Sequence, residues 1–213
     1  MPARSSAGDA CCDVFRHARA IAAAALAAAV AACGGGGGDA SSSAPGPAAP
    51  AASTPAGGTA TGGTTTASTC NLPDFRANLL ARINQVRAAG ANCGSDGVFG
   101  AAPPLAWNDL LTVAADGHSK DMAAKNYFSH TSADGRTLGD RVSAAGYAWT
   151  MLGENIAAGY ATTNAAMDGW IASPGHCANL MNASFAEVGV ACVPGTAGDA
   201  YSTYWTMDLG RPR

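Results

Sequence analysis

Basic residues are scarce in this chain of 213 residues, which contains 12 Lys and Arg against 15 Asp and Glu. From Cys33 to the C-terminus nine basic residues stand against thirteen acidic ones, so the formal net charge of that part is −4. Proteins that bind nucleic acid or anionic lipid headgroups through surface charge present a basic patch or stripe. The sequence encodes none, and nucleic acid is excluded as an expected partner.

Long apolar runs are also absent. The longest, residues 20–32, has 13 residues, whereas a helix that crosses the hydrocarbon core needs about 20. Arg4, Arg16 and Arg19 precede this run, and a positive flank before a short apolar stretch is typical of a cleavable export signal. Residues 1–32 are therefore predicted to be a signal peptide.

The apolar run ends in Val-Ala-Ala-Cys-Gly at residues 30–34, which resembles the lipobox of bacterial lipoproteins. This resemblance implies that Cys33 is lipidated and becomes the N-terminus of the mature protein. The protein would then be anchored at a periplasmic or cell-surface membrane through its lipid alone. The alternative is ordinary cleavage at the Ala-x-Ala site of residues 29–31, which would release a secreted protein.

Large side chains are missing from residues 34–69, which contain five consecutive glycines and otherwise only Ala, Ser, Pro, Thr and Gly apart from Asp39. Such a segment cannot bury enough apolar surface to offset the entropy of ordering it. We therefore expect a disordered linker over residues 33–69, with a root-mean-square span of about 30–35 Å. A folded domain is expected over residues 70–213.

Two of the seven cysteines lie in the predicted signal peptide and a third is Cys33, which leaves Cys70, Cys93, Cys177 and Cys192. An even number in an exported domain indicates disulfides, and four cysteines allow three pairings. The favoured pairing joins sequence neighbours, Cys70 with Cys93 and Cys177 with Cys192, since closing a loop of about 15 residues stabilises by about 3 kcal/mol. A four-cysteine zinc site is the competing interpretation, but no Cys-x-x-Cys spacing supports it.

Apolar residues at steps of three and four predict amphipathic helices. Helices are expected over residues 74–89, 108–126, 138–145 and 163–171. The period changes to two in residues 187–193 and 201–209, which indicates an antiparallel pair of strands. Helices followed by strands predict an α+β domain in which helices pack on a small antiparallel sheet.

Three histidines follow the predicted signal peptide, and their settings differ. His118 lies on the buried face of the second predicted helix and is expected to be a hydrogen-bonded core residue. His130 follows that helix in a polar segment, where it either caps the helix C-terminus or serves a site. His176 lies in the first turn of a short helix that begins at Ser173 and Pro174, a position that favours its neutral form.

Familiar catalytic motifs are missing. No pair of histidines has the spacing of a zinc-protease helix, and no Gly-x-Ser-x-Gly elbow supports a serine hydrolase. Glutamate occurs only twice, and Glu154 lies in an apolar segment, where an unpaired carboxylate would be costly. A partner is therefore expected for Glu154, although spacing alone does not show that it meets His130 and His176.

A series of short motifs runs through the predicted domain in a fixed order. The motifs are Asn-Gln-Val-Arg (84–87), Leu-Ala-Trp (105–107), His130, Gly-Glu-Asn-Ile (153–156), Ser-Pro-Gly-His (173–176), Glu-Val-Gly (187–189) and Tyr-Trp-Thr (204–206). Their order and spacing resemble the bacterial branch of the CAP superfamily. That superfamily includes cysteine-rich secretory proteins, insect venom allergens and plant pathogenesis-related proteins, and the resemblance covers about residues 74–210.

The resemblance implies an α-β-α sandwich with a small antiparallel sheet between helices (a CAP, or SCP-like, fold). It also implies a cleft with two histidines and two acids. The histidines correspond to His130 and His176, and the first acid corresponds to Glu154. The second acid of the family corresponds to Ser173 here, so the set is reduced to three. Glu187 could replace that acid in space, but its place at the start of a strand favours a structural role.

Three functions are compatible with such a cleft. The first is an exported binding module that takes a small lipid, a peptide or an envelope protein, with zinc or another divalent cation at His130 and His176 and with Glu154 nearby. The second is a metal-assisted, peptidase-like hydrolase in which Glu154 is the general base. A structural role in the envelope is the third. Binding is favoured over catalysis.

Overall fold

Residues 67–213 are described by a computed structural model, and they form five α-helices, one 3-10 turn and six strands. The helices are α1 (Phe75–Ala89), η1 (Gly94–Asp96), α2 (Asp109–Lys125), α3 (Leu138–Ala144), α4 (Thr163–Ala172) and α5 (Pro174–Met181). The strands are β1 (Ala91–Asn92), β2 (Val98–Phe99), β3 (Ala106–Trp107), β4 (Trp149–Ala158), β5 (Glu187–Pro194) and β6 (Thr203–Pro212).

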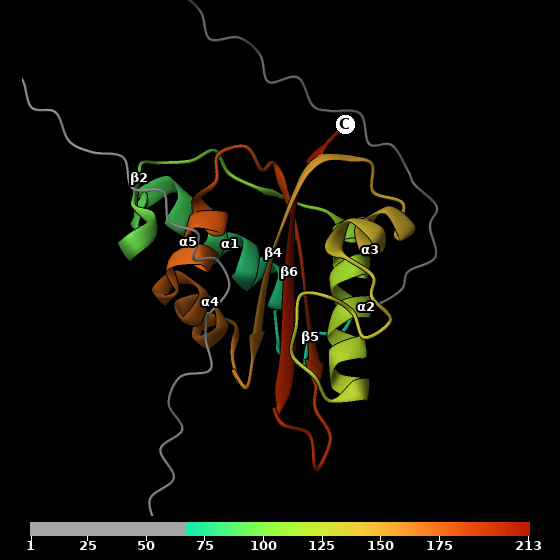
Figure 1. Ribbon diagram of the computed structural model, residues 1–213. Helices are drawn as coiled ribbons and strands as arrows, with labels where there is room; N and C mark the ends of the chain where they lie inside the picture. The colour runs from blue at the N-terminus through green and yellow to red at the C-terminus, as the bar shows by residue number, and fades with distance from the viewer. Residues whose placement is uncertain (1–66) are drawn as a thin grey trace, which may run out of the picture. The chain divides into compact units, whose positions relative to one another are not determined.

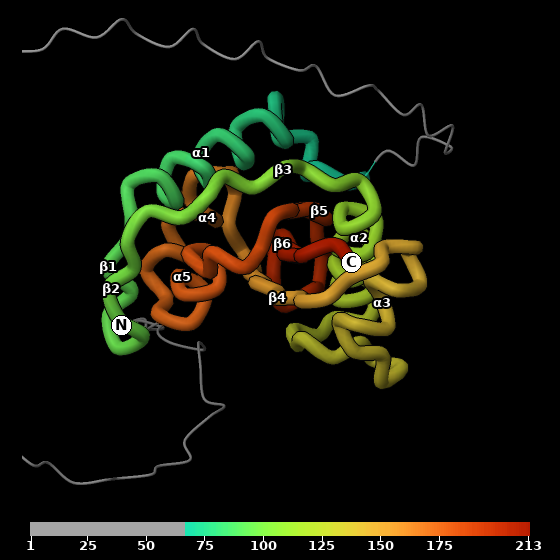
Figure 2. The backbone as a smooth tube through the Cα atoms, turned by 90° about the horizontal axis from the view of Figure 1, so that it is seen from above, coloured from blue at the N-terminus to red at the C-terminus, as the bar shows by residue number. Residues whose placement is uncertain are grey.

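These elements form three layers (Figure 1). The sheet lies in the middle, α1, α4 and α5 cover one face, and α2 and α3 cover the other, as the view from above also shows (Figure 2). The predicted α+β class and the α-β-α sandwich are confirmed. The four predicted helices and two predicted strands are all present, with ends within three residues of those expected.

The main sheet has the strand order β3-β5-β6-β4. β6 pairs with β5 on one side and β4 on the other, both antiparallel, whereas the two-residue strand β3 pairs with β5 in parallel. The predicted antiparallel pair is therefore confirmed, and the short parallel strand makes the sheet mixed. β1 and β2 form a separate two-stranded ribbon.

Strand β4 was not expected from the sequence. Its centre reads Gly153, Glu154 and Asn155, residue types that are depleted in strands. The strand nevertheless pairs with β6 along its whole length, and this pairing outweighs the local preference. This strand carries the glutamate of the predicted site.

The larger part of the core lies between the sheet and α1, α4 and α5. The Phe75 and Trp205 rings stack with centroids 5.7 Å apart, and Trp170 meets Trp205 edge-on at 6.5 Å. The buried indole N–H of Trp170 donates to the carbonyl of Ile156 at 3.2 Å. Aromatic packing thus joins α1 and α4 to the sheet.

Gly169 lies in the interior of α4, where glycine costs about 1 kcal/mol relative to alanine. The structure supplies the reason for it. A Cβ at this position would lie within 2.6 Å of both Oη and Cζ of Tyr160. The missing side chain therefore lets the Tyr160 ring pack directly against the helix.

The disulfides differ from the favoured pairing. Cys70 is bonded to Cys192 and Cys93 to Cys177, so the pairing between sequence neighbours was wrong. The physical reason is helix α1, whose 15 residues span about 22 Å between Cys70 and Cys93. Bonded cysteines have Cα atoms less than about 7 Å apart, so each cysteine pairs across the fold instead.

Residues just before the expected boundary at Cys70 already make contacts with the domain. The Ser68 amide donates to Asp116 Oδ1 at 2.8 Å, and the Cys192 amide donates to the Ser68 carbonyl at 2.9 Å. The predicted signal peptide, Cys33 and nearly all of the predicted linker lie outside the described residues. Among residues 67–213, no helix is long and apolar enough to span a membrane.

Candidate functional site

The site is built around Glu154, which lies near the middle of β4. Its side chain is only 3% exposed and faces the layer formed by α2 and α3. Oε1 accepts a hydrogen bond from His130 Nδ1 at 2.8 Å, and Oε2 accepts one from Arg141 Nη2 at 2.5 Å. The predicted partner of the carboxylate is therefore present twice, as a histidine and as a buried arginine.

Arg141 organises the chain around this carboxylate. Its side chain, also 3% exposed, projects from α3, which a capping box of Thr137 and Asp140 starts. Nη1 of Arg141 donates to the carbonyl of His130 at 3.0 Å and to Ser132 Oγ at 3.2 Å. One guanidinium therefore fixes both Glu154 and the backbone of the histidine that Glu154 binds.

His130 lies in the segment between α2 and α3, after Asn126 has ended α2 in the left-handed conformation at φ 50°. It does not cap that helix. Its side chain is 57% exposed, and the carboxylate at Nδ1 selects the tautomer with a hydrogen on that atom. In the neutral ring Nε2 is an acceptor, and the contact with Glu154 already sets the orientation of the ring.

Opposing influences set the pKa of Glu154. Burial by itself raises it, but the hydrogen bond from His130 and the positive charge of Arg141 together hold the pKa below its ordinary value. Glu154 is therefore an anion at neutral pH. In this state its ion pair with Arg141 is a buried, hydrogen-bonded one.

This lowered pKa predicts a pH dependence of stability. The contribution of Glu154 is complete above the pKa of about 4.3 that a glutamate has in an unfolded chain, and it is lost as the pH falls through the lower folded value. Urea unfolding between pH 3 and pH 6 should show a shallower loss of stability in Glu154→Gln than in the wild type. Parallel curves would contradict the assignment.

His118 is a core residue, as predicted. It is 0% exposed, and its Nε2 lies 2.9 Å from the carbonyl of Ser129. Burial, the largest influence, lowers the pKa of His118, so the ring is neutral. It supports the segment that carries His130.

His176 is partly buried in the first turn of α5. Burial, and then the electrostatic interaction with His130, lower the pKa of His176, which agrees in direction with the expected preference for the neutral form. The backbone of His176 is tied to β4, because Asn155 Nδ2 donates to its carbonyl at 3.0 Å. The structure thus bonds His130 to Glu154 directly and relates His176 to them through α5 and β4.

A zinc centre with an open position needs about three protein ligands. Both oxygens of Glu154 are already bound, and residues 67–213 hold no group of three or more His, Cys, Asp or Glu side chains arranged to bind a metal. The residues present therefore do not fit a three-ligand metal centre. A divalent cation at His130 and His176 alone stays a prediction.

Glu187 has the structural role that its place at the start of β5 favours. Its Oε2 accepts hydrogen bonds from the Tyr147 hydroxyl at 2.6 Å and from Asn108 Nδ2 at 3.2 Å. It ties the start of β5 to Asn108, the residue that caps α2. Glu187 does not replace the second acid of the family, whose position Ser173 occupies here.

Two residues of the site were missed by the sequence analysis. Arg141 was hidden in a short helix with no motif of its own. Asp208 of β6 lies opposite Glu154 and is 0% exposed; it belongs to the polar set of an alternating strand, which suggested exposure. The implied α-β-α sandwich was the signal that could have found Asp208. In that fold helices cover both faces of the sheet, so the polar residues Thr206 and Asp208 of this strand are buried as well.

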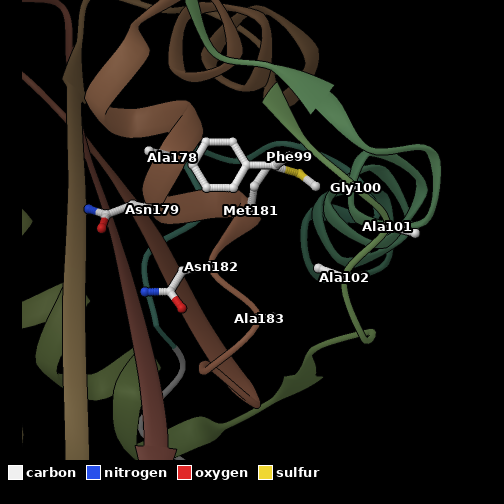
Figure 3. Close-up of a pocket in the computed structure, with 9 residues that line it drawn as sticks. All are labelled: Phe99, Gly100, Ala101, Ala102, Ala178, Asn179, Met181, Asn182 and Ala183. Carbon is white, nitrogen blue, oxygen red and sulfur yellow. The ribbon is translucent and has the colours of Figure 1, made fainter. Parts of the chain in front are cut away.

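A groove of about 570 Å³ runs beside α5 (Figure 3). Its lining is mainly apolar and comes from Phe99, Gly100, Ala101, Ala102, Ala178, Asn179, Met181, Asn182 and Ala183. Neither candidate histidine lines it. Asn179 connects it to the site, because its Nδ2 donates to the carbonyl of Glu154 at 3.2 Å.

The α-β-α sandwich, with His130 hydrogen-bonded to the buried Glu154, is the arrangement that the resemblance to CAP domains implies. Residues 80–209, more than half of the chain, match the family described as the cysteine-rich secretory protein family, CAP. The chain belongs to this family.

Two relatives come from Bacillus subtilis (strain 168). The "Uncharacterized membrane protein YlbC" is 40% identical over 86 residues, which are 40% of this chain and 25% of the relative. The "Uncharacterized protein YkwD" is 36% identical over 90 residues, 42% of this chain and 35% of the relative. The matched part of the chain spans only about a quarter to a third of these relatives.

Solved structures agree on the fold. An extracellular protein of Bacillus anthracis that contains an SCP domain aligns with a TM-score of 0.51 and 34% identity over 63% of this chain and 39% of that one. An outer surface protein of Borrelia burgdorferi aligns with a TM-score of 0.53 over 65% of this chain and 92% of that one. Its 18% identity makes this second likeness one of fold alone.

Proposed function

We propose that this CAP-domain protein is an exported binding module and that His130 is its recognition group. One observation carries the proposal: a half-exposed imidazole is held at Nδ1 by a buried carboxylate, which a buried arginine holds in turn. Such a ring loses little freedom when it binds, and this lowers the entropic cost of association. The proposed partner presents an O–H or N–H group to Nε2.

The chemistry of Glu154 favours binding over hydrolysis. A general base needs an oxygen within hydrogen-bond reach of the proton that it removes, and a pKa near the working pH. Both oxygens of Glu154 are occupied, its side chain is 3% exposed, and its pKa is lowered. These properties suit a residue that orients His130 better than one that activates water.

The groove beside α5 offers apolar contact area, and Asn179 in its lining is hydrogen-bonded to the backbone of Glu154. Its walls are small side chains together with Phe99 and Met181, which suits a short apolar peptide segment or an acyl chain. The proposed partner is therefore a peptide or small lipid of the cell envelope that combines an apolar part with a hydrogen-bond donor.

Binding can be tested with the full chain and a His130→Ala variant. The variant should keep its fold, since Arg141 still pairs with Glu154 and the His130 side chain is half-exposed. Arg136→Ala serves as the control for a change in the same surface segment. Defined probes are short apolar peptides and phospholipid vesicles, measured by fluorescence anisotropy and flotation. Affinity for the active probe should fall about tenfold in His130→Ala, the loss of one good hydrogen bond. Equal affinity in all three proteins would contradict the proposal.

The cation and hydrolase alternatives have their own readouts. If the two histidines hold a cation, calorimetric titration with Zn²⁺ alone should show uptake. Either His130→Ala or His176→Ala should abolish that uptake.

Hydrolysis has a different readout: the wild type would cleave members of a peptide library. Glu154→Gln would remove this cleavage without a change in Tm. We expect no cleavage.

Export through Cys33 is part of the proposal and has a direct test. Mass spectrometry of the mature protein should find a diacylated or triacylated Cys33 as the first residue. An unmodified first residue after position 33 would instead make the domain a secreted one. Either way the domain would act outside the cytoplasm.

A further inference from the structure

Asp208 is a carboxyl group that the proposed binding role does not use. It is 0% exposed, and no N–H or O–H group of residues 67–213 donates to either of its oxygens. An ionised carboxylate can only accept hydrogen bonds, and burying it without donors is very costly. Asp208 therefore lacks the surroundings that an ionised carboxylate requires.

The group that Asp208 faces is another carboxyl. Glu154 is its direct partner across β4 and β6, and side chains in such pairs lie on the same face with Cβ atoms about 4.5–5.5 Å apart. Two carboxylates so close cannot both ionise readily. Glu154 receives hydrogen bonds from His130 and Arg141, whereas Asp208 receives none, so the shared proton belongs on Asp208.

Charge balance leads to the same assignment. Arg141 of α3 supplies one positive charge, and Glu154 of β4 matches it. From α2, His118 faces the cluster as a buried neutral ring, and β5 places only Gly189 beside Asp208. An ionised Asp208 would add one buried negative charge with no partner.

The remaining titratable neighbour, His130, reaches this cluster only through Glu154. Burial, and then the charge of Glu154, raise the pKa of Asp208 well above its ordinary value, and Arg141 acts in the opposite direction. The electrostatic balance therefore agrees with the geometry.

We propose that Asp208 is a protonated carboxyl at neutral pH and a positioning residue, which directs its hydrogen to Glu154 and so holds that carboxylate against His130. Glu154 would then be fixed from three elements: β6, α3 and the segment between α2 and α3. The consequence for ligand recognition rests on the proposed function of His130, whereas the proton itself is tested without any ligand.

The direct test is carbon-13 NMR of the full chain labelled at aspartate. The side-chain carboxyl resonance of Asp208, assigned by its absence in Asp208→Asn, should stay at the position of a neutral acid from pH 4 to pH 7. A resonance that instead titrates with the pKa of an ordinary aspartate, about 3.9, would overturn the proposal. The measurement is independent of whether His130 binds a ligand.

The positioning role is tested by two substitutions that separate its components. Asp208→Asn is neutral and keeps a donor toward Glu154, while Asp208→Ala is neutral and has none. The Nδ1–H signal of His130 should be retained in Asp208→Asn and should exchange with water about tenfold faster in Asp208→Ala, as expected for the loss of one hydrogen bond. Equal exchange rates in both variants would show that Asp208 does not position Glu154.

A stability measurement covers the case in which the alanine variant does not fold. An acid whose pKa is raised by folding loses stability as the pH rises from its unfolded pKa toward its folded one. Between pH 5 and pH 7 the Tm of the wild type should therefore fall relative to that of Asp208→Asn, by roughly 2–4 °C per pH unit. The exposed Asp96→Asn serves as control and should show no such trend. A constant difference between wild type and Asp208→Asn would contradict the protonated state.

Discussion

Replacing Arg141 with alanine should destabilise the domain by about 3–5 kcal/mol at pH 7, because it leaves the buried Glu154 carboxylate without its cation. The guanidinium is 3% exposed and also donates to the carbonyls of His130 and Arg136 and to Ser132. Its removal therefore uncovers a charge and several acceptors at once. Urea unfolding followed by circular dichroism measures the loss.

Two comparisons make this prediction specific. Arg136→Ala removes an exposed arginine from the same segment, whose ion pair with Asp134 lies at the surface, and it should unfold close to the wild type. The double variant Arg141→Ala with Glu154→Gln should lose clearly less than the sum of its two single changes, since neither charge is then left alone. Additive losses would mean that Arg141 acts mainly through packing.

Gly189→Ala should cost about 3 kcal/mol or more, because β5 lies directly against the backbone of α2 at this point. An added Cβ would lie 2.2 Å from the amide nitrogen of Thr112 and 2.5 Å from the carbonyl carbon of Leu111. Backbone atoms of a helix cannot turn aside as the end of a side chain can. The helix must shift away from the sheet, and with it the layer that covers Glu154 and Asp208.

Gly117→Ala is the matched control for this substitution. Gly117 lies in the same helix, α2, on its exposed side, and an added Cβ would meet nothing within 4 Å. This change should stabilise the domain by about 0.5–1 kcal/mol, the usual gain for alanine over glycine in a helix. Thermal unfolding of both variants should therefore show shifts of opposite sign. A loss in Gly117→Ala, or no loss in Gly189→Ala, would contradict the packing described.

Local sequence patterns were sufficient for most elements of the fold. The helices α1 to α4 follow from apolar residues at steps of three and four, and β5 and β6 follow from alternation. β4 could not be predicted in this way, because Gly153, Glu154 and Asn155 disfavour strands and only pairing with β6 overrides that preference. Gly169 is another case, since its reason is the ring of Tyr160, which packs there in the folded state.

By itself the sequence determined the kind of domain, the neutral state expected for His176 and the need of Glu154 for a partner. Each depends on the residue itself or on its close neighbours in the chain. The tertiary structure alone decided which cysteines pair, that Arg141 is the partner of Glu154 beside His130, and that Asp208 lies opposite that glutamate. These contacts join residues that are 13 to 122 positions apart, and the packing of helices on both faces of the sheet brings them together. Burial in that packing also makes their charges interact strongly enough to decide which group carries a proton.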